Sequence, residues 1–205
     1  MKNYFIKIFL IFLFFNSNAQ YKEWEDLSIF KINTEEPHTF FIPKDINGDS
    51  ITKSLNGTWS FKLFKNDELV PKDFYKNDFK KDDWQDIPVP SNWQFHTDDF
   101  PLYTNIVYPY EINPPFMPKE YNPIGLYQRE FSIDKNWNDK QIFIHFGAVK
   151  SAFYLYINGD FVGYSEGSKT PAEFEISKYL NGSVNQLVMK VIRWSDGTYI
   201  EDQDF

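Results

Sequence analysis

Short segments in which hydrophobic and polar residues alternate, separated by turn signals, constrain the fold of this chain more than any other feature. Residues 55–64 show this period-two pattern, which is typical of a half-buried β-strand. Residues 151–165 place Asn158-Gly159 between two apolar runs, which predicts a β-hairpin with a tight turn. Further strands are predicted over residues 127–133, 141–149, 172–176 and 185–194. Because almost no helical pattern is present, we expect an all-β fold, a jelly-roll β-sandwich.

Two segments depart from the strand pattern. Residues 172–182 are predicted to end in a single turn, with Ser177 as its N-cap and Asn181-Gly182 as its stop. Residues 84–127 contain eight of the twelve prolines, so this stretch is predicted to be neither a helix nor a central strand. The same stretch is rich in aromatic residues, which argues against disorder. We predict an ordered loop that lies over the sandwich and shapes a pocket.

Composition and charge restrict the class of partner. Aromatic residues make up 20% of the chain, which suits strands and also suits stacking on sugars or bases. A net charge of −8 lacks the basic footprint of a nucleic-acid-binding protein and disfavours an anionic membrane surface. No cysteine is present, so disulfides and thiolate zinc sites are excluded. His38, His96 and His145 show no metal-ligand spacing and are interpreted as ordinary strand or loop residues.

The first nineteen residues form a unit of their own. Two lysines precede an uninterrupted apolar run, and small residues occupy the two positions that a signal peptidase reads. The run is shorter than the roughly 20 apolar residues that a membrane-spanning helix needs. We therefore predict a cleavable signal peptide over residues 1–19 and a secreted or periplasmic protein, with an uncleaved anchor as the alternative. Residues 20–54 are interpreted as an extended N-terminal arm, and residues 55–205 as the folded domain.

Three carboxylates, Glu201, Asp202 and Asp204, gather beside aromatic residues at the end of the sequence. They lie within four residues of one another, so they cannot easily face each other across a sugar as the two carboxylates of a glycosidase do. A site for a hard cation fits them better, since carboxylate oxygens are the ligands of such ions. A solvated acidic loop is the other interpretation. Their aromatic neighbours favour a carbohydrate site, with hydroxyl acceptors next to stacking faces.

Several long motifs occur together and in order, and they resemble the N-terminal domain of the large bacterial β-galactosidases, the family-2 glycoside hydrolases. The resemblance covers nearly all of the chain from Trp24 onward. The motifs are "VPSNWQ" (89–94), "DDFPLYTNIVYP" (98–109), "NPPFMPKEYNPIGLYQREF" (113–131), "SAFYLYINGDFVGYSEGSKTPAEFEI" (151–176) and "RWSDGTYIEDQDF" (193–205).

The resemblance implies a function for two residues and two cation sites. In the family this sugar-binding domain is a jelly-roll that lends loops to the active site of a catalytic barrel. Asn105 of "YTN" and Asp204 of "EDQD" match the residues that hydrogen-bond the galactosyl hydroxyls, and Asp204 matches a ligand of Na⁺. A second, structural cation, Mg²⁺, is implied for four positions that keep an oxygen ligand even where their residue type differs from the family pattern: Glu23, Asp26, Glu166 and Asp196.

The resemblance also implies that the sequence stops before the final strand of the sandwich and before both catalytic glutamates. We therefore expect the N-terminal part of a secreted β-galactosidase, whose partners are a β-galactoside and the downstream domains of the same enzyme, and which is inactive alone. The alternatives are a stand-alone, non-catalytic carbohydrate-binding module and a structural sandwich. Other specificities of the family, β-glucuronidase and β-mannosidase, are disfavoured by the "YTN" and "EDQD" motifs.

Overall fold

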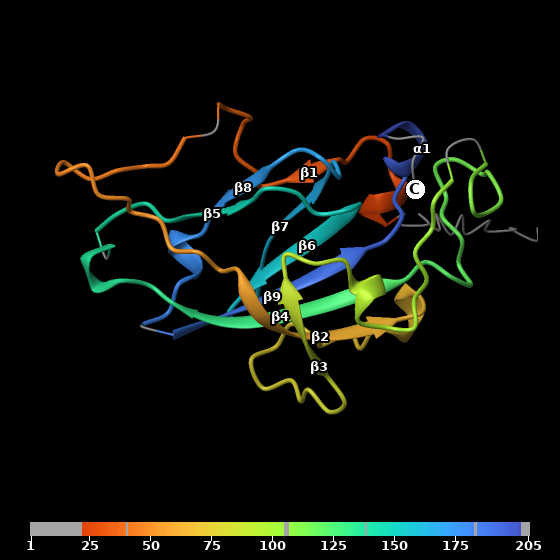
Figure 1. Ribbon diagram of the computed structural model, residues 1–205, viewed down its shortest axis with the longest axis horizontal. Coiled ribbons are helices and arrows are strands. Elements are labelled where there is room, and N and C mark those ends of the chain that lie inside the picture. The colour runs from red at the N-terminus through yellow and green to blue at the C-terminus, as the bar shows by residue number, and fades with distance from the viewer. Residues whose placement is uncertain (1–21, 40, 105–106, 138, 183, 202–205) are drawn as a thin grey trace, which may run out of the picture.

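Two antiparallel sheets form the body of the molecule (Figure 1). The computed structural model describes residues 22–39, 41–104, 107–137, 139–182 and 184–201. The larger sheet has seven strands in the order β1-β7-β6-β9-β4-β2-β3, and the smaller sheet pairs β5 with β8. The strands are β1 Lys31–Ile32, β2 Gly57–Phe64, β3 Gln85–Val89, β4 Ile124–Ser132, β5 Phe143–Phe146, β6 Ala152–Ile157, β7 Asp160–Glu166, β8 Ala172–Glu175 and β9 Val184–Ile192. The predicted all-β sandwich is confirmed.

Helical structure is confined to single turns in the described part of the chain. The one α-helical turn, α1 Thr198–Glu201, follows the strand β9. The 3₁₀ turns are η1 Glu23–Glu25, η2 Asp67–Leu69, η3 Trp93–Phe95, η4 Lys135–Trp137 and η5 Ser177–Tyr179.

The predicted hairpin joins β6 to β7 and is confirmed. Asn158 and Gly159 both have positive φ, 53° and 88°, which a tight type I′ turn requires. The side-chain amide of Asn158 donates to the carbonyl of Tyr179 at 2.8 Å and to Asn185 Oδ1 at 2.7 Å. The turn residue therefore also fixes η5 and the start of β9 beside the hairpin.

One face of the seven-stranded sheet packs against the β5–β8 pair. Phe61 of β2, Leu155 of β6 and Leu187 of β9 are fully buried there against Phe174 of β8. Each side chain of this size contributes about 1.5–3 kcal/mol when it is removed from water. This packing forms the main core of the sandwich.

The opposite face of the same sheet is also covered, here by loops and turns. Leu126 of β4, Ile192 of β9 and Tyr164 of β7 are fully buried, and Trp24 of η1 packs over them. Strands β4, β6 and β9 are therefore apolar on both faces, because the sheet has no solvated side at its centre. The segment between β2 and β3 adds Phe74 to this second core.

The structure corrects two local predictions. The proline-rich segment contains a strand, β3, in which Pro88 pairs with Thr58 of β2. Proline is tolerated because β3 lies at the edge of the sheet and needs hydrogen bonds on one side only. Ser177 was predicted to cap its turn, but its hydroxyl instead accepts the N–H of Ile142 at 2.8 Å.

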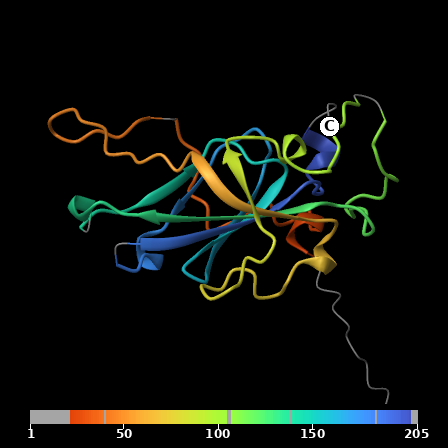
Figure 2. The same cartoon turned by 60° about the horizontal axis from the view of Figure 1, so that its bottom comes forward.

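The N-terminal arm and the proline-rich loop leave the sandwich at opposite ends (Figures 1 and 2). The arm adds η1 and β1 to the body of the molecule and then extends away from it. Residue 44 and residue 50 form an isolated bridge within this excursion. The proline-rich loop lies beside α1, and this end of the sandwich brings the sequence motifs together.

Candidate functional site

The two residues that the resemblance assigns to sugar recognition, Asn105 and Asp204, lie outside the described residues. The described residues nearest to Asn105 in the sequence are Thr104 and Val107, and the one nearest to Asp204 is Glu201. The site is therefore described through the loop from Trp93 to Met117 and through the chain that leaves β9, named here the exit segment, residues 193–201.

Asp99 is the polar centre of the loop. Its carboxylate has no exposed surface and accepts from Trp93 Nε1 at 2.6 Å, from Arg193 Nη1 at 2.6 Å and from the backbone N–H of Phe100 at 3.0 Å. The hydroxyl of Tyr121 donates to it as well. Burial, and then this hydrogen bond, raise the pKa of Tyr121 to about 12, so the phenol remains a donor at physiological pH. One carboxylate thus joins η3, the loop and the exit segment.

Arg193 completes this junction from the exit segment. Its guanidinium binds Asp99 through Nη1 and the carbonyl of Phe100 through Nη2, at 2.6 and 3.0 Å. The guanidinium also lies over the rings of Phe100 and Trp194, with centroids at 5.3 and 4.7 Å. A forked cation held on two acceptors and two rings has little freedom to move. The loop therefore has a fixed position at Phe100.

A second junction lies on the far side of residues 105–106. Tyr108 donates its hydroxyl to the carbonyl of Tyr199 at 2.9 Å, and the two rings pack with centroids 5.4 Å apart. The hydroxyl of Tyr199 donates to the carbonyl of Phe116 at 2.9 Å and accepts the N–H of Asn113 at 3.2 Å. The loop is thus bound to the exit segment both before and after the "YTN" motif.

Trp194 fills the space beneath these junctions. Asn122 holds its backbone on both sides, donating to its carbonyl at 2.9 Å and accepting its N–H at 3.1 Å. The rings of Tyr110 and Tyr121 pack against its indole. The exit segment is therefore a rigid base for the loop.

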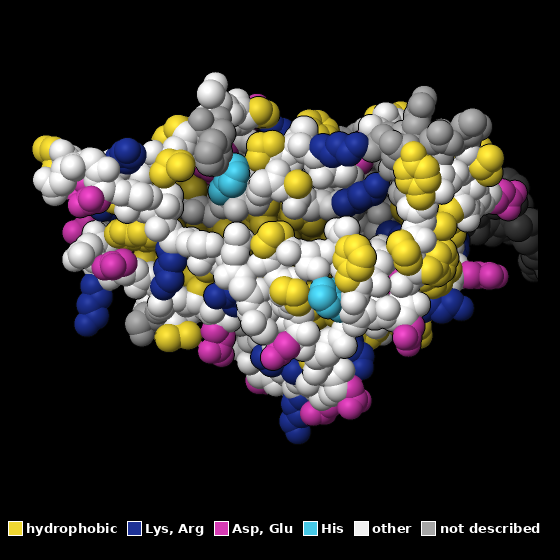
Figure 3. All heavy atoms as spheres, viewed as in Figure 1, with side chains coloured by type: hydrophobic (Ala, Val, Ile, Leu, Met, Phe, Trp, Pro, Cys, Tyr) yellow, Lys and Arg dark blue, Asp and Glu magenta, His cyan; other side chains and the backbone are white. Residues whose placement is uncertain are grey.

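Hydrophobic side chains are exposed on this end of the molecule (Figure 3). Tyr103 is 83% exposed and Ile200 is 85% exposed. Within the described residues, the loop and the exit segment expose these large hydrophobic side chains: Phe95, Phe100, Tyr103, Val107, Ile112 and Ile200.

The carboxyl groups of Glu166 and Asp196, two of the four residues assigned to the second cation, face each other. They lie within hydrogen-bonding range, and the Tyr164 hydroxyl donates to Glu166. Burial raises the pKa of Glu166 to about 9, with further contributions from the nearby Asp196 and Glu201 charges. Burial also raises the pKa of Asp196, whose Oδ2 atom is buried and has no hydrogen-bond partner. With a pKa near 9, Glu166 is protonated at neutral pH and shares its proton with Asp196, and a cation that replaced this proton would be held between two carboxylates.

The other two assigned residues have hydrogen-bond partners of their own, and the charge of Asp26 also contributes to the raised pKa of Asp196. The hydroxyl of Tyr154 donates to the carboxylate of Glu23, and Asp26 accepts from the N–H and the hydroxyl of Ser28 at 3.0 and 2.7 Å. Within the described residues, no group of three or more acidic, histidine or cysteine side chains is arranged to hold a metal ion. The Glu166–Asp196 pair alone fits a cation in this arrangement, and Glu23 and Asp26 remain predicted ligands.

Glu201 is part of the fold and does not extend into solvent as a free acid. Its carboxylate accepts from the backbone N–H of Ser168 at 2.8 Å and from the Ser168 hydroxyl at 2.5 Å. These bonds tie α1 to the turn after β7. Its acidic neighbour Asp202 lies outside the described residues. The predicted cluster of Glu201, Asp202 and Asp204 therefore stays a prediction.

The turn η1 is held on the sheet by a group of charges around Trp24. Asp67 of η2 pairs with Lys22 at 2.8 Å and with the buried Lys190 of β9. The ammonium groups of both lysines lie 4.8 Å from the Trp24 ring. Burial raises the pKa of Asp67, but the two lysines outweigh it, so the net pKa lies below the ordinary value.

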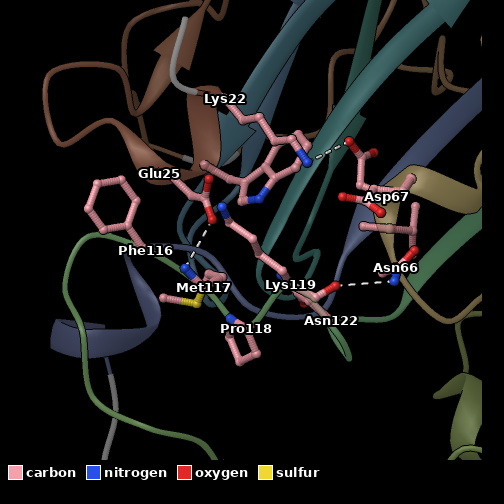
Figure 4. Close-up of a pocket in the computed structure, with 12 residues that line it drawn as sticks. Lys22, Glu25, Asn66, Asp67, Phe116, Met117, Pro118, Lys119 and Asn122 are labelled. Carbon is pink, nitrogen blue, oxygen red and sulfur yellow. Dashed lines mark hydrogen bonds and ion pairs between the residues drawn. The ribbon is translucent and has the colours of Figure 1, made fainter. Parts of the chain in front are cut away.

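A pocket of about 300 Å³ lies between η1, η2 and the end of the proline-rich loop (Figure 4). Glu25 closes one side, because it accepts the backbone N–H of Met117 at 3.0 Å. The amide of Asn66 closes another by donating to the carbonyl of Lys119 at 3.1 Å. The prediction that the proline-rich loop shapes a pocket is confirmed, since residues 116–119 line it.

The three histidines take part in local contacts. His38 of the arm and His145 of β5 both approach the carboxylate of Glu173, at 3.4 and 3.2 Å. His96 is hydrogen-bonded to the hydroxyl of Ser91 at 2.7 Å.

No helix in the part of the chain that the structure describes is long and apolar enough to cross a membrane.

Comparison with known proteins decides the family. A profile described as "Glycosyl hydrolases family 2, sugar binding domain" matches residues 52–205. The chain belongs to glycosyl hydrolase family 2. Two proteins named β-galactosidase are similar to this family 2 chain: that of Priestia megaterium is 42% identical over 199 residues, and that of Psychromonas ingrahamii is 46% identical over 160 residues.

The family 2 chain covers only part of these relatives. The alignment spans 90% of this chain but 19% of the Priestia protein, and 78% of this chain but 15% of the Psychromonas protein. Among solved structures, a β-glucuronidase from Ruminococcus gnavus in complex with N1-substituted uronic isofagomine superposes with a TM-score of 0.51 and 26% identity. That match covers 68% of this chain and 21% of the other. A β-glucuronidase from an uncultured Clostridium, at 24% identity and a TM-score of 0.50, shows the same fold.

Sequence reasoning missed the residues that hold the family 2 site together. Asp99 and Arg193 lie inside the quoted motifs, but neither was singled out, because a buried ion pair leaves no local pattern when its partners are 94 positions apart. Tyr199 was noted only as an aromatic neighbour of the acids. The sequence offered little signal, because a buried charge needs a partner but the spacing in the sequence does not reveal which residue that partner is.

Proposed function

We propose that this chain is the N-terminal sugar-binding part of a β-galactosidase, an enzyme that as a whole hydrolyses terminal non-reducing β-D-galactosides. One observation carries the proposal: the loop with the "YTN" motif is bound at Phe100 and at Tyr108 to the exit segment that leads into "EDQD". The relatives that are 42% and 46% identical and are named β-galactosidase support the choice of substrate.

In this proposal the domain recognises sugar and does not perform the chemistry. Asn105 and Asp204 hydrogen-bond galactosyl hydroxyls, and a carboxylate in such a role makes charge-assisted bonds that are stronger than neutral ones. The catalytic glutamates belong to a barrel domain of the same enzyme. In this proposal the exposed hydrophobic side chains of the loop and of Ile200 are the surface that meets the barrel.

Two cations belong to the proposal. Na⁺ is bound by Asp204 next to the sugar, and it supplies positive charge to the hydroxyl oxygens and to the carboxylate. Mg²⁺ is bound by Glu166 and Asp196, with Glu23 and Asp26 as the further ligands. The facing carboxyl groups and the unpartnered Asp196 Oδ2 support the Mg²⁺ site. Its role is structural, because these residues join β7 to the exit segment.

The protein is proposed to be exported, with residues 1–19 as a cleaved signal peptide. The charged start and the short apolar run support this localisation. The mature protein is expected to begin at Gln20. Mass spectrometry of the secreted and periplasmic fractions tests it, and an exported protein that still carries residues 1–19 contradicts it.

The substrate class is tested with nitrophenyl glycosides on the full-length protein that carries this domain. We expect the β-galactoside to have a higher kcat/KM than the β-glucuronide and the β-mannoside. A preference for the glucuronide or the mannoside overturns the assignment. The chain of 205 residues is the matched control and is expected to be inactive on all three substrates. If the protein in the cell ends at Phe205 and binds galactose, the alternative of a stand-alone carbohydrate-binding module is favoured.

A further inference from the structure

A buried ion pair connects the two segments that carry the sugar-binding motifs. Asp99 belongs to the loop and Arg193 begins the exit segment, one residue after the end of β9. The side chain of Asp99 is fully buried and that of Arg193 is 8% exposed, with 2.6 Å between their charged atoms. Each charge is also hydrogen-bonded or stacked elsewhere, so both are compensated.

We propose that Asp99 and Arg193 are positioning residues for galactoside binding. The pair fixes Phe100 against the base formed by Trp194, and Asn105 follows five residues later in the sequence. The same pair fixes the start of the exit segment, whose sequence leads to Asp204. The inference rests on the proposed function, because it assigns these two residues to the galactosyl site of that function.

Strand β9 offers an internal comparison. A second ion pair, Lys190–Asp67, joins the same strand to a different loop, and its side chains are 12% and 23% exposed. It holds η1 and η2 on the second core of the sandwich, where its side chains contact Lys22, Trp24 and Tyr154. Breaking either pair leaves a buried charge without a partner, so both changes lower stability. Only the change at Asp99 or Arg193 should disturb the sugar-binding loop.

The kinetic experiment compares three variants of the full-length enzyme with a nitrophenyl β-galactoside at a temperature where all are folded. Asp99→Asn removes the charge, and Arg193→Lys keeps the charge but loses the fork that also holds Phe100. Each is expected to lower kcat/KM about tenfold or more, mainly through KM, because misplaced hydrogen-bonding groups weaken binding of substrate and transition state alike. Asp67→Asn is the matched control and is expected to keep the wild-type KM.

A second readout uses the isotope-labelled chain itself and does not depend on activity. The Trp93 indole N–H donates to Asp99, so its NMR signal reports the state of this carboxylate. In Asp99→Asn we expect this signal to shift and the amides of Phe100 and of residues 102–104 to gain fast motion. The amides of the β4–β9 ladder should keep their protection from hydrogen exchange. Asp67→Asn should leave the Trp93 signal and the loop amides unchanged.

The outcomes separate the inference from the function on which it rests. If Asn105→Ala and Asp204→Asn lower kcat/KM but Asp99→Asn and Arg193→Lys do not, the positioning role is wrong and the proposed function stands. If Asn105→Ala and Asp204→Asn have no effect, the galactosyl site itself is wrong. If Asp67→Asn raises KM as much as Asp99→Asn does, the effect is general destabilisation and the inference is overturned.

Discussion

At the scale of single residues, buried charges decide how the loops and turns attach to the sheet. Asp67 accepts from Lys22 and from Lys190, and Asp99 accepts from Arg193 and three further donors. In both places a carboxylate collects donors from segments that are distant in the sequence. The turns η1 and η3 have no side-chain cap, so these carboxylates provide attachments that the turns themselves lack.

The change Asp67→Asn should lower the free energy of unfolding by about 3 kcal/mol at pH 7, because it leaves the buried Lys190 without a counter-charge. The pKa of Asp67 is depressed in the folded protein. Its contribution is therefore present above the unfolded pKa, about 4, and is lost as the pH falls through the lower folded value. Denaturant unfolding between pH 7 and pH 2 should show the variant and the wild type converging in acid. A constant difference over this range contradicts the ion pair.

Added Mg²⁺ should raise the melting temperature of the chain if Glu166 and Asp196 bind it, since a ligand that binds only the folded state stabilises it. Asp196→Asn removes one charge of the facing pair and should abolish this response at millimolar Mg²⁺. Differential scanning calorimetry with Mg²⁺ and with a chelator measures it. Asp45→Asn is the control and should keep the response, because the carboxylate of Asp45 accepts the N–H groups of Asn47 and Asp49 within the arm. A wild-type chain whose melting temperature ignores Mg²⁺ contradicts the site.

At the scale of elements, the strand β4 and the turn η3 are packed without spare room. Gly125 of β4 faces the ring of Trp93, and a Cβ there would lie 2.7 Å from the Trp93 ring and 2.9 Å from Phe61. Trp93 cannot withdraw freely, because its indole N–H is bonded to Asp99. Glycine at this position therefore lets η3 lie flat on the sheet and brings the loop over it.

The change Gly125→Ala should lower the free energy of unfolding by about 1–3 kcal/mol, the usual cost of overpacking a core. It should also shift the Trp93 indole signal, since the ring must move. Chemical denaturation and the NMR spectrum of the chain measure both effects. Gly147→Ala is the control, because a Cβ at Gly147 meets no atom within 4 Å. An unchanged Trp93 signal in Gly125→Ala would show that the packing is looser than described.

The elements that the sequence predicted correctly are those with a local signal. The β6–β7 hairpin has Asn158-Gly159 at its turn, and the strand pattern of residues 55–64 corresponds to β2. The edge strand β3 was missed because the proline in it overrode the strand signal, although an edge position tolerates proline. Ser177 was misassigned because the N–H that its hydroxyl accepts comes from Ile142, 35 residues away.

The candidate site was predictable only as far as motifs reach. The motifs placed sugar recognition in the "YTN" and "EDQD" segments, but the contacts between these segments are made by Asp99, Arg193 and Tyr199. Such contacts join residues 83 to 94 positions apart and follow from packing, so no local pattern encodes them. The contact between Glu166 and Asp196 is of the same kind, because it joins the end of β7 to the exit segment.

At the scale of the whole molecule, the two cores lie on the faces of the central sheet and the loop lies at one end. The loop is anchored in both cores, since Trp93 belongs to the first and Met117 to the second. A rigid body that presents loops at one end is the usual design of a β-sandwich that binds a ligand. The chain spans about a fifth of the length of the Priestia β-galactosidase, so the galactosyl site of the proposal needs the rest of the enzyme.

The most direct test of this account is the kcat/KM of the full-length enzyme for a nitrophenyl β-galactoside, measured over a sodium titration in the wild type and in Asp204→Asn. The variant keeps the shape of the side chain and removes the charge that is proposed to bind both Na⁺ and a hydroxyl. A charge-assisted hydrogen bond contributes about 1.5–3 kcal/mol, so kcat/KM should fall by about 10- to 150-fold. The sodium response should weaken in the same variant. Wild-type efficiency together with a wild-type sodium response in Asp204→Asn would contradict the account.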